Sequence, residues 1–334
     1  MKKIGFLFLC ILQFSCTSQS QTKINGISFV SSREGVAQDH VEKVVNLNAN
    51  HAAVMPFGFV QNINSPKVNF NTDRQWYGET KKGVSQYIDI LHKNGIAVMM
   101  KPQIWIRGGE FTGTLEMHTE EDWKILEDTY RDFITMYAKV AADAKVDMFC
   151  IGTELEKFVE NRPNYWLKLI VEIKEIYKGK LTYASNWDEF KKTPFWEELD
   201  YVGVDAYFPL SEAKSPTVEN LKAGWRYWKD ELATFSEEKS KPILFTEYGY
   251  RSMDYTAKKP WLVDRNEEKV NLEAQVNATH AIIEEFWPEK WFAGGYVWKW
   301  FINHKRSGGI EDNRFTPQNK PAENTIRELY KKYQ

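Results

Sequence analysis

The sequence contains very little cysteine. Three residues of 334 are cysteine, and two of them, Cys10 and Cys16, lie close to the N-terminus. Cys150 is alone in the remainder of the chain, so no disulfide framework is expected. Because Cys150 lies inside an apolar run, we expect it to be a small buried hydrophobic residue.

Signals of several protein classes are also missing. The net charge is −2, and setting aside Lys2 and Lys3 leaves −4, which gives no electrostatic footprint for nucleic acid. The chain has no His-Glu-x-x-His motif, no cysteine pair for zinc and no Gly-x-Ser-x-Gly elbow. Hydrophobic residues make up 43% and charged residues 27% of the chain, which is ordinary for a globular protein.

Residues 4–14 form a short apolar run, preceded by Lys2 and Lys3 and followed by Ser15 and Cys16. This order is typical of an export signal, and the run is too short to span a bilayer, which takes ~20 residues. Cysteine after a small residue predicts a lipoprotein signal at residues 1–16, lipidation of Cys16, and a polar tether at 17–23. Gln13 stands where such signals usually carry leucine, which leaves plain export open. We expect an exported protein, anchored to a membrane on its periplasmic or cell-surface side, or otherwise secreted.

Residues 24–334 alternate short apolar runs with longer amphipathic segments, eight times over. The expected strands are 26–31, 52–57, 96–101, 148–153, 181–185, 201–205, 243–246 and 295–299. The expected helices are 38–48, 81–93, 120–144, 165–177, 218–236, 267–286 and 322–332, with a poor short helix at 194–199. Continuous hydrophobic strands are typical of sheets that are covered on both sides.

Eight βα units without a long linker predict an α/β protein with a single (β/α)8 TIM barrel over residues 24–334. Length alone also fits two ordinary domains. A doubly wound open sheet is the other alternative. It usually has a glycine-rich phosphate loop after its first strand, and the segment from Ser31 to Gly35 is no such loop.

Aromatic residues are abundant, at 15% of the chain. They fill cores, and they also form flat surfaces on which the apolar faces of sugars stack. Trp225 and Trp228 are three residues apart in an expected helix, so we interpret them as packed on the barrel. We give Trp123, Trp166 and Trp287 the same interpretation.

Two glutamates stand at the ends of expected strands. Glu154 follows the fourth strand and Glu247 follows the seventh. In a TIM barrel the active site lies at these carboxyl ends, so the two side chains face each other across the mouth. One glutamate after a strand is as often a loop residue or a helix cap. Two together predict the paired carboxyl groups that cleave a glycosidic bond by double displacement.

The other strand ends carry polar groups beside aromatic rings, a combination that suits a polyhydroxylated ligand. We predict substrate-binding roles for Lys101 and Trp105 after the third strand, Asn186 after the fifth, Asp205 and Tyr207 at the sixth, and Trp298 on the eighth.

With these motifs the chain resembles the clan of retaining glycosidases with acid/base on strand four and nucleophile on strand seven. Within the clan it is most similar to glycoside hydrolase family 113, the endo-β-1,4-mannanase family. The similarity covers nearly all of residues 24–334 and rests on Phe149-Cys150-Ile151-Gly152-Thr153-Glu154-Leu155, Phe245-Thr246-Glu247-Tyr248-Gly249-Tyr250 and Phe315-Thr316-Pro317-Gln318-Asn319-Lys320-Pro321-Ala322.

The resemblance implies that Glu154 is the acid/base and Glu247 the nucleophile. It also implies that Tyr207 holds the nucleophile and that Trp298 is a sugar platform. One position departs from the clan: Thr153 stands where most members have an asparagine that binds the sugar 2-hydroxyl. In a mannoside that hydroxyl is axial, so a different partner is tolerable.

For this chemistry Glu154 must be protonated while Glu247 is ionised, whereas reference pKa values of ~4.3 would ionise both. The expected mechanism needs no metal and no organic cofactor, and we expect a monomer acting on β-1,4-mannan or glucomannan. Three alternatives stay open: a non-catalytic surface glycan-binding lipoprotein, a metal-dependent barrel hydrolase, and a glycosidase of the same clan with another β-glycan substrate. The sequence leaves endo or exo action open.

Overall fold

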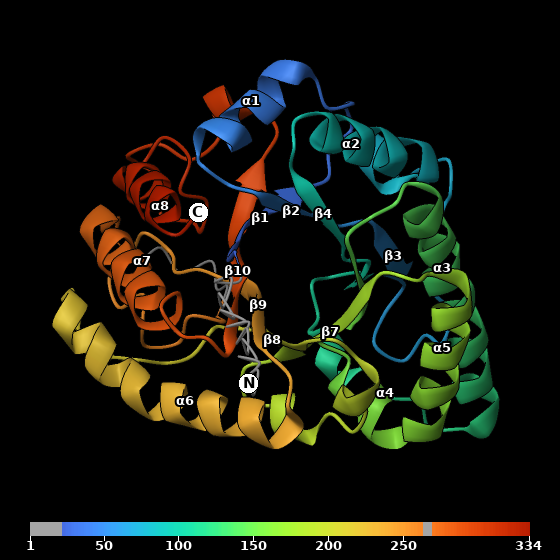
Figure 1. The fold of residues 1–334 in the computed structure, drawn as a ribbon. Coiled ribbons are helices and arrows are strands. Elements are labelled where there is room, and N and C mark those ends of the chain that lie inside the picture. The colour runs from blue at the N-terminus through green and yellow to red at the C-terminus, as the bar shows by residue number, and fades with distance from the viewer. Residues whose placement is uncertain (1–21, 263–268) are drawn as a thin grey trace, which may run out of the picture.

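The computed structural model describes residues 22–262 and 269–334, so the expected leader and most of the tether lie outside the described residues. Eight parallel strands close into a barrel in the order β1-β10-β9-β8-β7-β6-β4-β2 (Figure 1). They are β1 (Ile24–Val30), β2 (His51–Val54), β4 (Ala97–Met100), β6 (Met148–Thr153), β7 (Lys180–Asn186), β8 (Val202–Asp205), β9 (Ile243–Tyr248) and β10 (Phe292–Phe301). All eight correspond to expected strands, and the predicted single TIM barrel is confirmed.

Helices surround the barrel (Figure 1). They are α1 (Gln38–Asn46), α2 (Lys81–Lys93), α3 (Glu120–Asp143), α4 (Glu156–Asn161), α5 (Pro163–Ile176), α6 (Val218–Lys239), α7 (Leu272–Phe286) and α8 (Pro321–Lys332). Short 3-10 turns at Phe190–Lys192 and Trp196–Glu198 replace the expected poor helix at 194–199. None of the helices in the described ranges is long and apolar enough to cross a membrane.

One additional helix and two helix boundaries differ from the sequence prediction for local reasons. Helix α4 was not expected, because its six residues are too few to show a helical period. Helix α6 extends to Lys239 and ends where Ser240 adopts a left-handed conformation, φ 51°. Helix α7 was expected from residue 267 but begins at Leu272, where the Asn271 side chain caps it by accepting a hydrogen bond from Ala274 N.

A two-stranded parallel sheet, β3 (Phe57–Val60) with β5 (Gln103–Ile106), lies outside the barrel and was not predicted. Each strand continues the chain beyond β2 or β4 after a proline, Pro56 or Pro102. Proline has no N–H for the sheet ladder, which ends the barrel pairing at these points. The short extensions then pair with each other and place Gln103 and Trp105 above the carboxyl ends of the barrel strands.

Apolar side chains of different sizes fill the interior of the barrel. They form one buried cluster of Ile24, Ala53, Met99, Met148, Cys150, Ala184, Leu244, Ala293 and Tyr296. The ring of Tyr296 lies beside Gly26, where a Cβ atom would stand 2.4 Å from it. Gly26 therefore provides the space for this ring. Cys150 is fully buried, as predicted.

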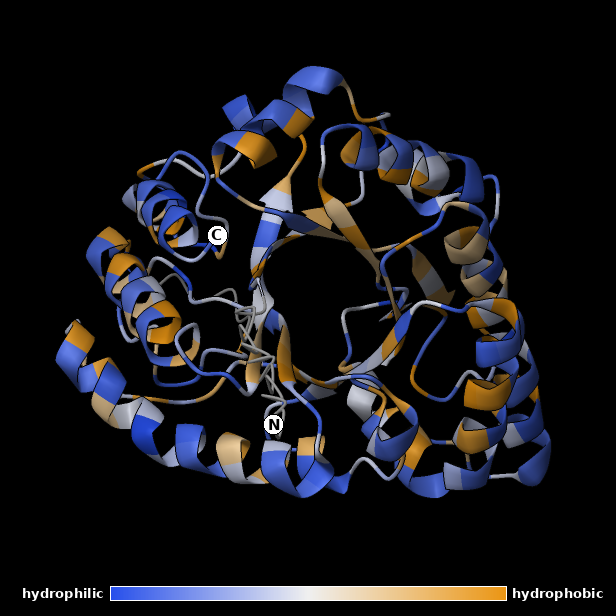
Figure 2. Cartoon of the chain, in the orientation of Figure 1, coloured by the Kyte–Doolittle hydropathy of each residue, from blue (hydrophilic) through white to orange (hydrophobic). Residues whose placement is uncertain are grey.

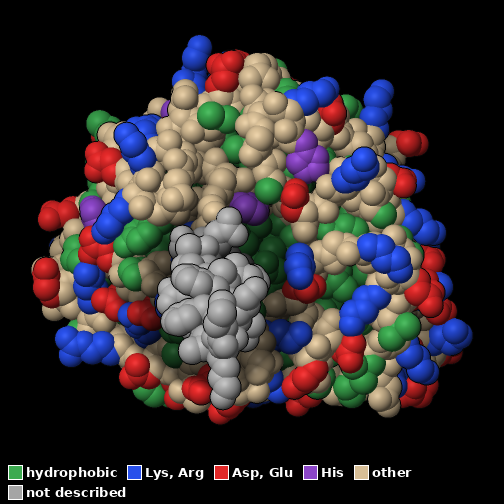
Figure 3. Space-filling model, in the orientation of Figure 1, with side chains coloured by type: hydrophobic (Ala, Val, Ile, Leu, Met, Phe, Trp, Pro, Cys, Tyr) green, Lys and Arg blue, Asp and Glu red, His purple; other side chains and the backbone are tan. Residues whose placement is uncertain are grey.

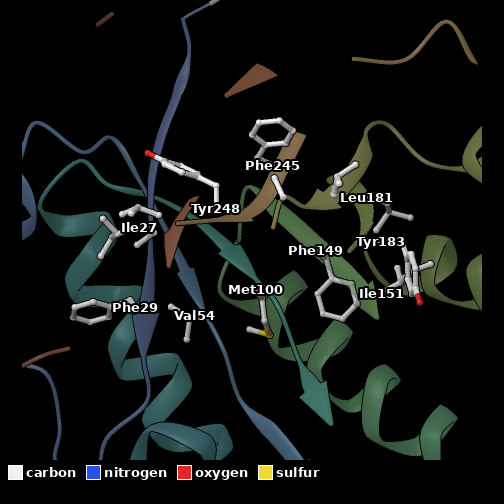
Figure 4. Packing of buried hydrophobic residues seen from close by; sticks show 14 of the residues in the cluster. Ile27, Phe29, Val54, Met100, Phe149, Ile151, Leu181, Tyr183, Phe245 and Tyr248 are labelled. Atoms are coloured by element: carbon white, nitrogen blue, oxygen red, sulfur yellow. The ribbon is translucent and has the colours of Figure 1, made fainter. Parts of the chain in front are cut away.

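The larger core lies between the barrel and its helices. Side chains from several strands meet there, among them Phe149, Ile151, Tyr183 and Phe245 (Figure 4). The helices turn hydrophobic stripes inward and hydrophilic faces outward (Figure 2). Burial of Trp123, Trp166, Trp225 and Trp287, with at most 6% exposure, confirms their prediction as core residues, and the partly buried Trp228 packs against the same core.

Candidate active site

The predicted catalytic glutamates stand at the same end of the barrel. Glu154 directly follows β6, and Glu247 is the fifth residue of β9. In the closed strand order β8 and β7 lie between these two strands, so β6 and β9 are on opposing sides of the barrel. Both carboxyl groups therefore reach the mouth formed by the carboxyl ends of the strands.

Three side chains from other strands hold the Glu247 carboxylate. Lys101 Nζ lies 2.5 Å and Gln103 Nε2 3.0 Å from Oε1, and the Tyr207 hydroxyl donates to Oε2 at 2.7 Å. Burial, followed by the nearby charge of Glu247, raises the pKa of Tyr207 well above its usual value, so this hydroxyl stays protonated as a donor. Donors on both oxygens fix the orientation of this carboxyl group.

A buried ion pair lies beneath Glu247. Lys101 Nζ is 3.2 and 3.3 Å from the two Asp205 oxygens, and Thr246 donates to Oδ1 of Asp205 at 2.7 Å. Burial opposes the charge on Lys101, but Asp205 and Glu247 outweigh it and raise the ammonium pKa. Burial and the Glu247 charge raise the pKa of Asp205 to about 7, while Lys101 and the Thr246 hydroxyl favour its ionised form.

Lys101 and Asp205 were predicted to bind substrate, and their placement requires a correction. Both side chains have 0% exposure; they bond to each other, and Lys101 also bonds to Glu247. A sugar cannot reach them. Their contribution is therefore indirect, through the position and charge of Glu247.

Glu154 has different surroundings. Its backbone is in the left-handed region at φ 48°, and its N–H donates to Ala184 O at 2.8 Å. Burial raises its pKa well above the usual value, and the charges of Asp205, Glu247 and Glu156 raise it further, against the opposing charge of Lys101. Glu154 is thus suited to carry a proton at neutral pH.

These surroundings make two chemically different carboxyl groups at one barrel mouth. One is a carboxylate with three donors, and the other is a carboxyl group kept protonated by its environment. This is the division that glycoside hydrolysis by two carboxyl groups requires. Within residues 22–262 and 269–334, no group of three or more His, Cys, Asp or Glu side chains could hold a metal ion.

The sequence model of Glycoside Hydrolase Family 113 matches residues 30–320. The chain belongs to this family. It is therefore a family 113 glycoside hydrolase, as its resemblance implied. A comparison with curated proteins gives no match.

Solved structures share the fold of this family 113 chain. A GH113 β-mannanase from Alicyclobacillus acidocaldarius, in complex with ManMIm, is 22% identical with a TM-score of 0.82, and the match covers 94% of this chain and 98% of that one. A GH113 β-1,4-mannanase is 20% identical with a TM-score of 0.79, covering 93% and 99%. A β-glucuronidase from Faecalibacterium prausnitzii is 17% identical with a TM-score of 0.64, covering 94% of this chain and 49% of that one.

Aromatic side chains border the mouth of the family 113 barrel. Trp298 on β10 is partly buried, and Trp105 on β5 is 50% exposed. The Trp105 ring meets Phe57 edge to face at 6.5 Å. Exposed indole faces such as that of Trp105 suit stacking against a sugar chain. The opposite end of the barrel faces the viewer in Figure 3 and carries charged side chains of both signs.

Asn186 is partly exposed at the end of β7, and its Oδ1 accepts a hydrogen bond from Trp187 N at 3.0 Å. Its amide nitrogen has no protein partner in the described part of the chain. The Trp187 ring stacks on Trp261 with centroids 5.0 Å apart. Trp261 belongs to the segment between β9 and α7, of which residues 263–268 lie outside the described ranges.

Two residues near Glu247 were missing from the predicted site. Gln103 bonds Glu247 directly, and Phe315 packs edge to face on Tyr207 with centroids 5.9 Å apart. Gln103 is two residues beyond Lys101 in an extended segment, and side chains at this spacing point to the same face. That spacing is a signal that could have identified it. Nothing local to Phe315 shows that it would meet Tyr207, 108 residues earlier.

Proposed function

We propose that this family 113 enzyme hydrolyses β-1,4-linked mannan or glucomannan by double displacement, with Glu247 as nucleophile and Glu154 as acid/base. The observation that carries the proposal is the contrast between the two carboxyl groups. The names of the GH113 neighbours, β-mannanase and β-1,4-mannanase, support the substrate. The exposed Trp105 and the partly buried Trp298 supply stacking surfaces for a sugar chain.

In the first step Glu247 Oε attacks the anomeric carbon while Glu154 gives its proton to the departing glycosidic oxygen. The products are a glycosyl ester on Glu247 and a released sugar chain that carries the new hydroxyl group. Ester formation removes the negative charge of Glu247, which is one cause of the raised pKa of Glu154. Glu154 then becomes more acidic and can act as a base.

In the second step Glu154 takes a proton from water, and the water oxygen attacks the same anomeric carbon. The ester bond breaks, and Glu247 returns to its carboxylate form with the three donors already in place. Two displacements at one carbon give net retention of configuration. Lys101, Gln103 and Tyr207 need not move for either step.

The test is hydrolysis of a matched panel of β-glycans, with the anomer of the first product followed by NMR. We expect cleavage of β-1,4-mannan and glucomannan, slower cleavage of β-1,4-glucan and β-1,4-xylan, and β product first. An α product would contradict double displacement. Binding of mannan without cleavage would support a glycan-binding protein instead.

We also propose that Cys16 is lipidated and anchors the exported protein. The charged, apolar, Ser-Cys leader supports this, and so does the position of the tether. Strand β1 begins at Ile24, so the tether joins the barrel at the end opposite to the catalytic glutamates. Just before it, Lys23 Nζ bonds the backbone oxygens of Glu289 and Phe292. A lipid at Cys16 would therefore leave the barrel mouth directed away from the membrane.

The Cys16→Ala variant should move from the membrane to the soluble fraction, because stable anchoring requires more than one acyl chain and all of them depend on this cysteine. A Cys10→Ala variant is the matched control and should stay with the membrane. Unchanged fractionation of Cys16→Ala would rule out the anchor. We expect the released protein to be a monomer, which light scattering after size-exclusion chromatography measures.

A further inference from the structure

A lysine without an anionic partner lies beside the sugar platform. Lys299 follows Trp298 on β10, and its Nζ is 5.1 Å from the centroid of the Trp298 ring and 5.4 Å from that of Phe301. The side chain is partly buried. Within residues 22–262 and 269–334 no hydrogen bond or ion pair reaches Nζ. Lysines in such positions are normally paired, because a desolvated charge without a partner is costly.

An arginine on the adjacent loop is also unpaired. The backbone of Arg314 is fixed, since its N–H donates to Asp312 Oδ1 at 2.6 Å and its carbonyl accepts from Lys320 Nζ at 2.8 Å. Its side chain is exposed and makes no hydrogen bond or ion pair with the described part of the protein. The next residue, Phe315, packs on Tyr207, the donor to Glu247. Arg314 therefore belongs to the wall of the catalytic mouth.

The two cations act on each other. Burial lowers the pKa of Lys299, the charge of Glu247 partly opposes this, and the positive charge of Arg314 lowers it further. Other lysines around the site are compensated: Lys101 by Asp205 and Glu247, and Lys320 by Asp312. We call Lys299 and Arg314 the basic pair; within the described residues neither side chain has an anionic partner.

We propose that this basic pair binds the carboxylate of a hexuronic acid unit, so that the enzyme accepts acidic β-linked sugar chains at the platform of Trp298. The proposal rests on the proposed function and names a further substrate class for the same site. A carboxylate can accept charge-assisted hydrogen bonds from the guanidinium and the ammonium together. The hydroxyl groups of a neutral sugar carry no charge to offset the pair.

The reaction cycle strengthens the need for such an anion. Glu247 is the acidic group that raises the Lys299 pKa, and its charge disappears when the glycosyl ester forms. The basic pair then faces the intermediate without compensation. A carboxylate on the bound sugar would supply a negative charge throughout the cycle.

The test compares one set of manno-oligosaccharides before and after oxidation of their primary hydroxyls to carboxylates. We expect wild-type enzyme to cleave the oxidised chains with kcat/KM at least equal to that for the neutral chains. Lys299→Met and Arg314→Met should each lower kcat/KM for oxidised chains by roughly 10–100-fold, mainly through KM, the scale for a lost hydrogen bond between charged groups. For neutral chains, which have no carboxylate to bind, the loss of kcat/KM in each variant should be clearly smaller than the loss for oxidised chains.

Two controls separate charge recognition from damage to the fold. Arg226 is an exposed arginine on the outer helix α6, and Arg226→Met should leave both activities unchanged. Lys299→Arg should keep the preference for oxidised chains. Raising the salt concentration from 0.05 to about 0.5 M should increase KM for oxidised chains only, because salt screens exposed charges.

The proposal fails if wild-type enzyme binds oxidised chains more weakly than neutral ones, or if Arg314→Met and Lys299→Met affect both substrates equally. In either case continued cleavage of neutral mannan would leave the proposed function intact. If wild-type enzyme cleaves neither substrate, the proposed function itself is wrong.

Discussion

Glu247 and Glu154 have the same residue before them, threonine, yet their environments differ in kind. The Glu247 carboxylate accepts from Lys101, Gln103 and Tyr207. The Glu154 carboxyl group accepts no side-chain hydrogen bond within the described ranges, and negative charges surround it. Glu247 has hydrogen-bond donors on both carboxyl oxygens. Burial and neighbouring negative charges instead raise the pKa of Glu154.

The local sequence therefore does not set the difference between the carboxyl groups of Glu154 and Glu247. The donors to Glu247 come from positions 40 to 146 residues away in the chain. The charge that most raises the pKa of Glu154, after burial, is that of Asp205 on another strand. The barrel closes these strands around one mouth, so the asymmetry is a property of the assembled fold.

Removal of the Glu247 carboxyl group should have the largest effect on activity. Glu247→Ala should lower kcat by on the order of 10⁶-fold, the scale for loss of a covalent nucleophile. Azide can enter the vacated space and attack once, which yields a glycosyl azide of α configuration that NMR identifies. A β-azide from this variant would assign the nucleophile to the other glutamate.

Removal of the protonated partner should cost less. Glu154→Ala is expected to lose ~10²–10⁴-fold on mannan, whose leaving group needs a proton. An activated aryl mannoside should still form the intermediate, and azide should trap it as the β product. The control is Glu160→Ala on α4, an exposed glutamate paired with Lys157, which should keep wild-type rates. Equal losses on both substrates would argue against a proton-donor role for Glu154.

The donors to Glu247 can be weakened one at a time. Tyr207→Phe removes one hydrogen bond to the carboxylate and should lower kcat/KM by roughly 10–100-fold, as expected for a bond to a charged group. Tyr177→Phe removes a buried hydroxyl that bonds Val146 O at 2.7 Å, far from the mouth. It should leave kcat/KM near wild type, so similar losses in the two variants would mean that the Tyr207 effect is structural.

The smallest expected effect comes from a substitution that changes only the electrostatic surroundings of Glu154. Glu156 is a nearby acid whose pKa burial raises to about 7, and above that pH its charge keeps the pKa of Glu154 high. In Glu156→Gln this charge is absent, so Glu154 loses its proton more easily and the basic limb of the kcat/KM profile on mannan should move to lower pH. Rates on an activated aryl mannoside serve as the control. A limb that stays in place or moves upward would show that Glu156 does not act on Glu154.

Much of the fold was predictable, because hydrophobic runs and amphipathic segments mark elements that pack on a barrel. All eight barrel strands and the buried tryptophans, such as Trp225, followed from these patterns. Helix α4 was missed because its six residues are too few to show a helical period. Strands β3 and β5 were missed because each follows directly on a barrel strand, after Pro56 or Pro102.

The sequence predicted where in the barrel the site residues lie better than it predicted which residues they contact. Strand ends identified Glu154, Glu247 and Tyr207, because barrel geometry alone brings strand ends together. The same argument assigned Lys101 and Asp205 to substrate, since it cannot tell a side chain at the mouth from one beneath it. Gln103 was missed, although its spacing from Lys101 places both side chains on one face, because strand β5 was not predicted.

The ring of Tyr296 also bears on access to the site, because it fills part of the barrel interior. It has 0% exposure and fills the space that Gly26 leaves open. The described part of the barrel is therefore a packed core and not a pore, so substrate, leaving group and water reach the two glutamates from the carboxyl ends of the strands. In the proposed reaction the departing sugar must leave Glu154 before a water molecule can take its place there.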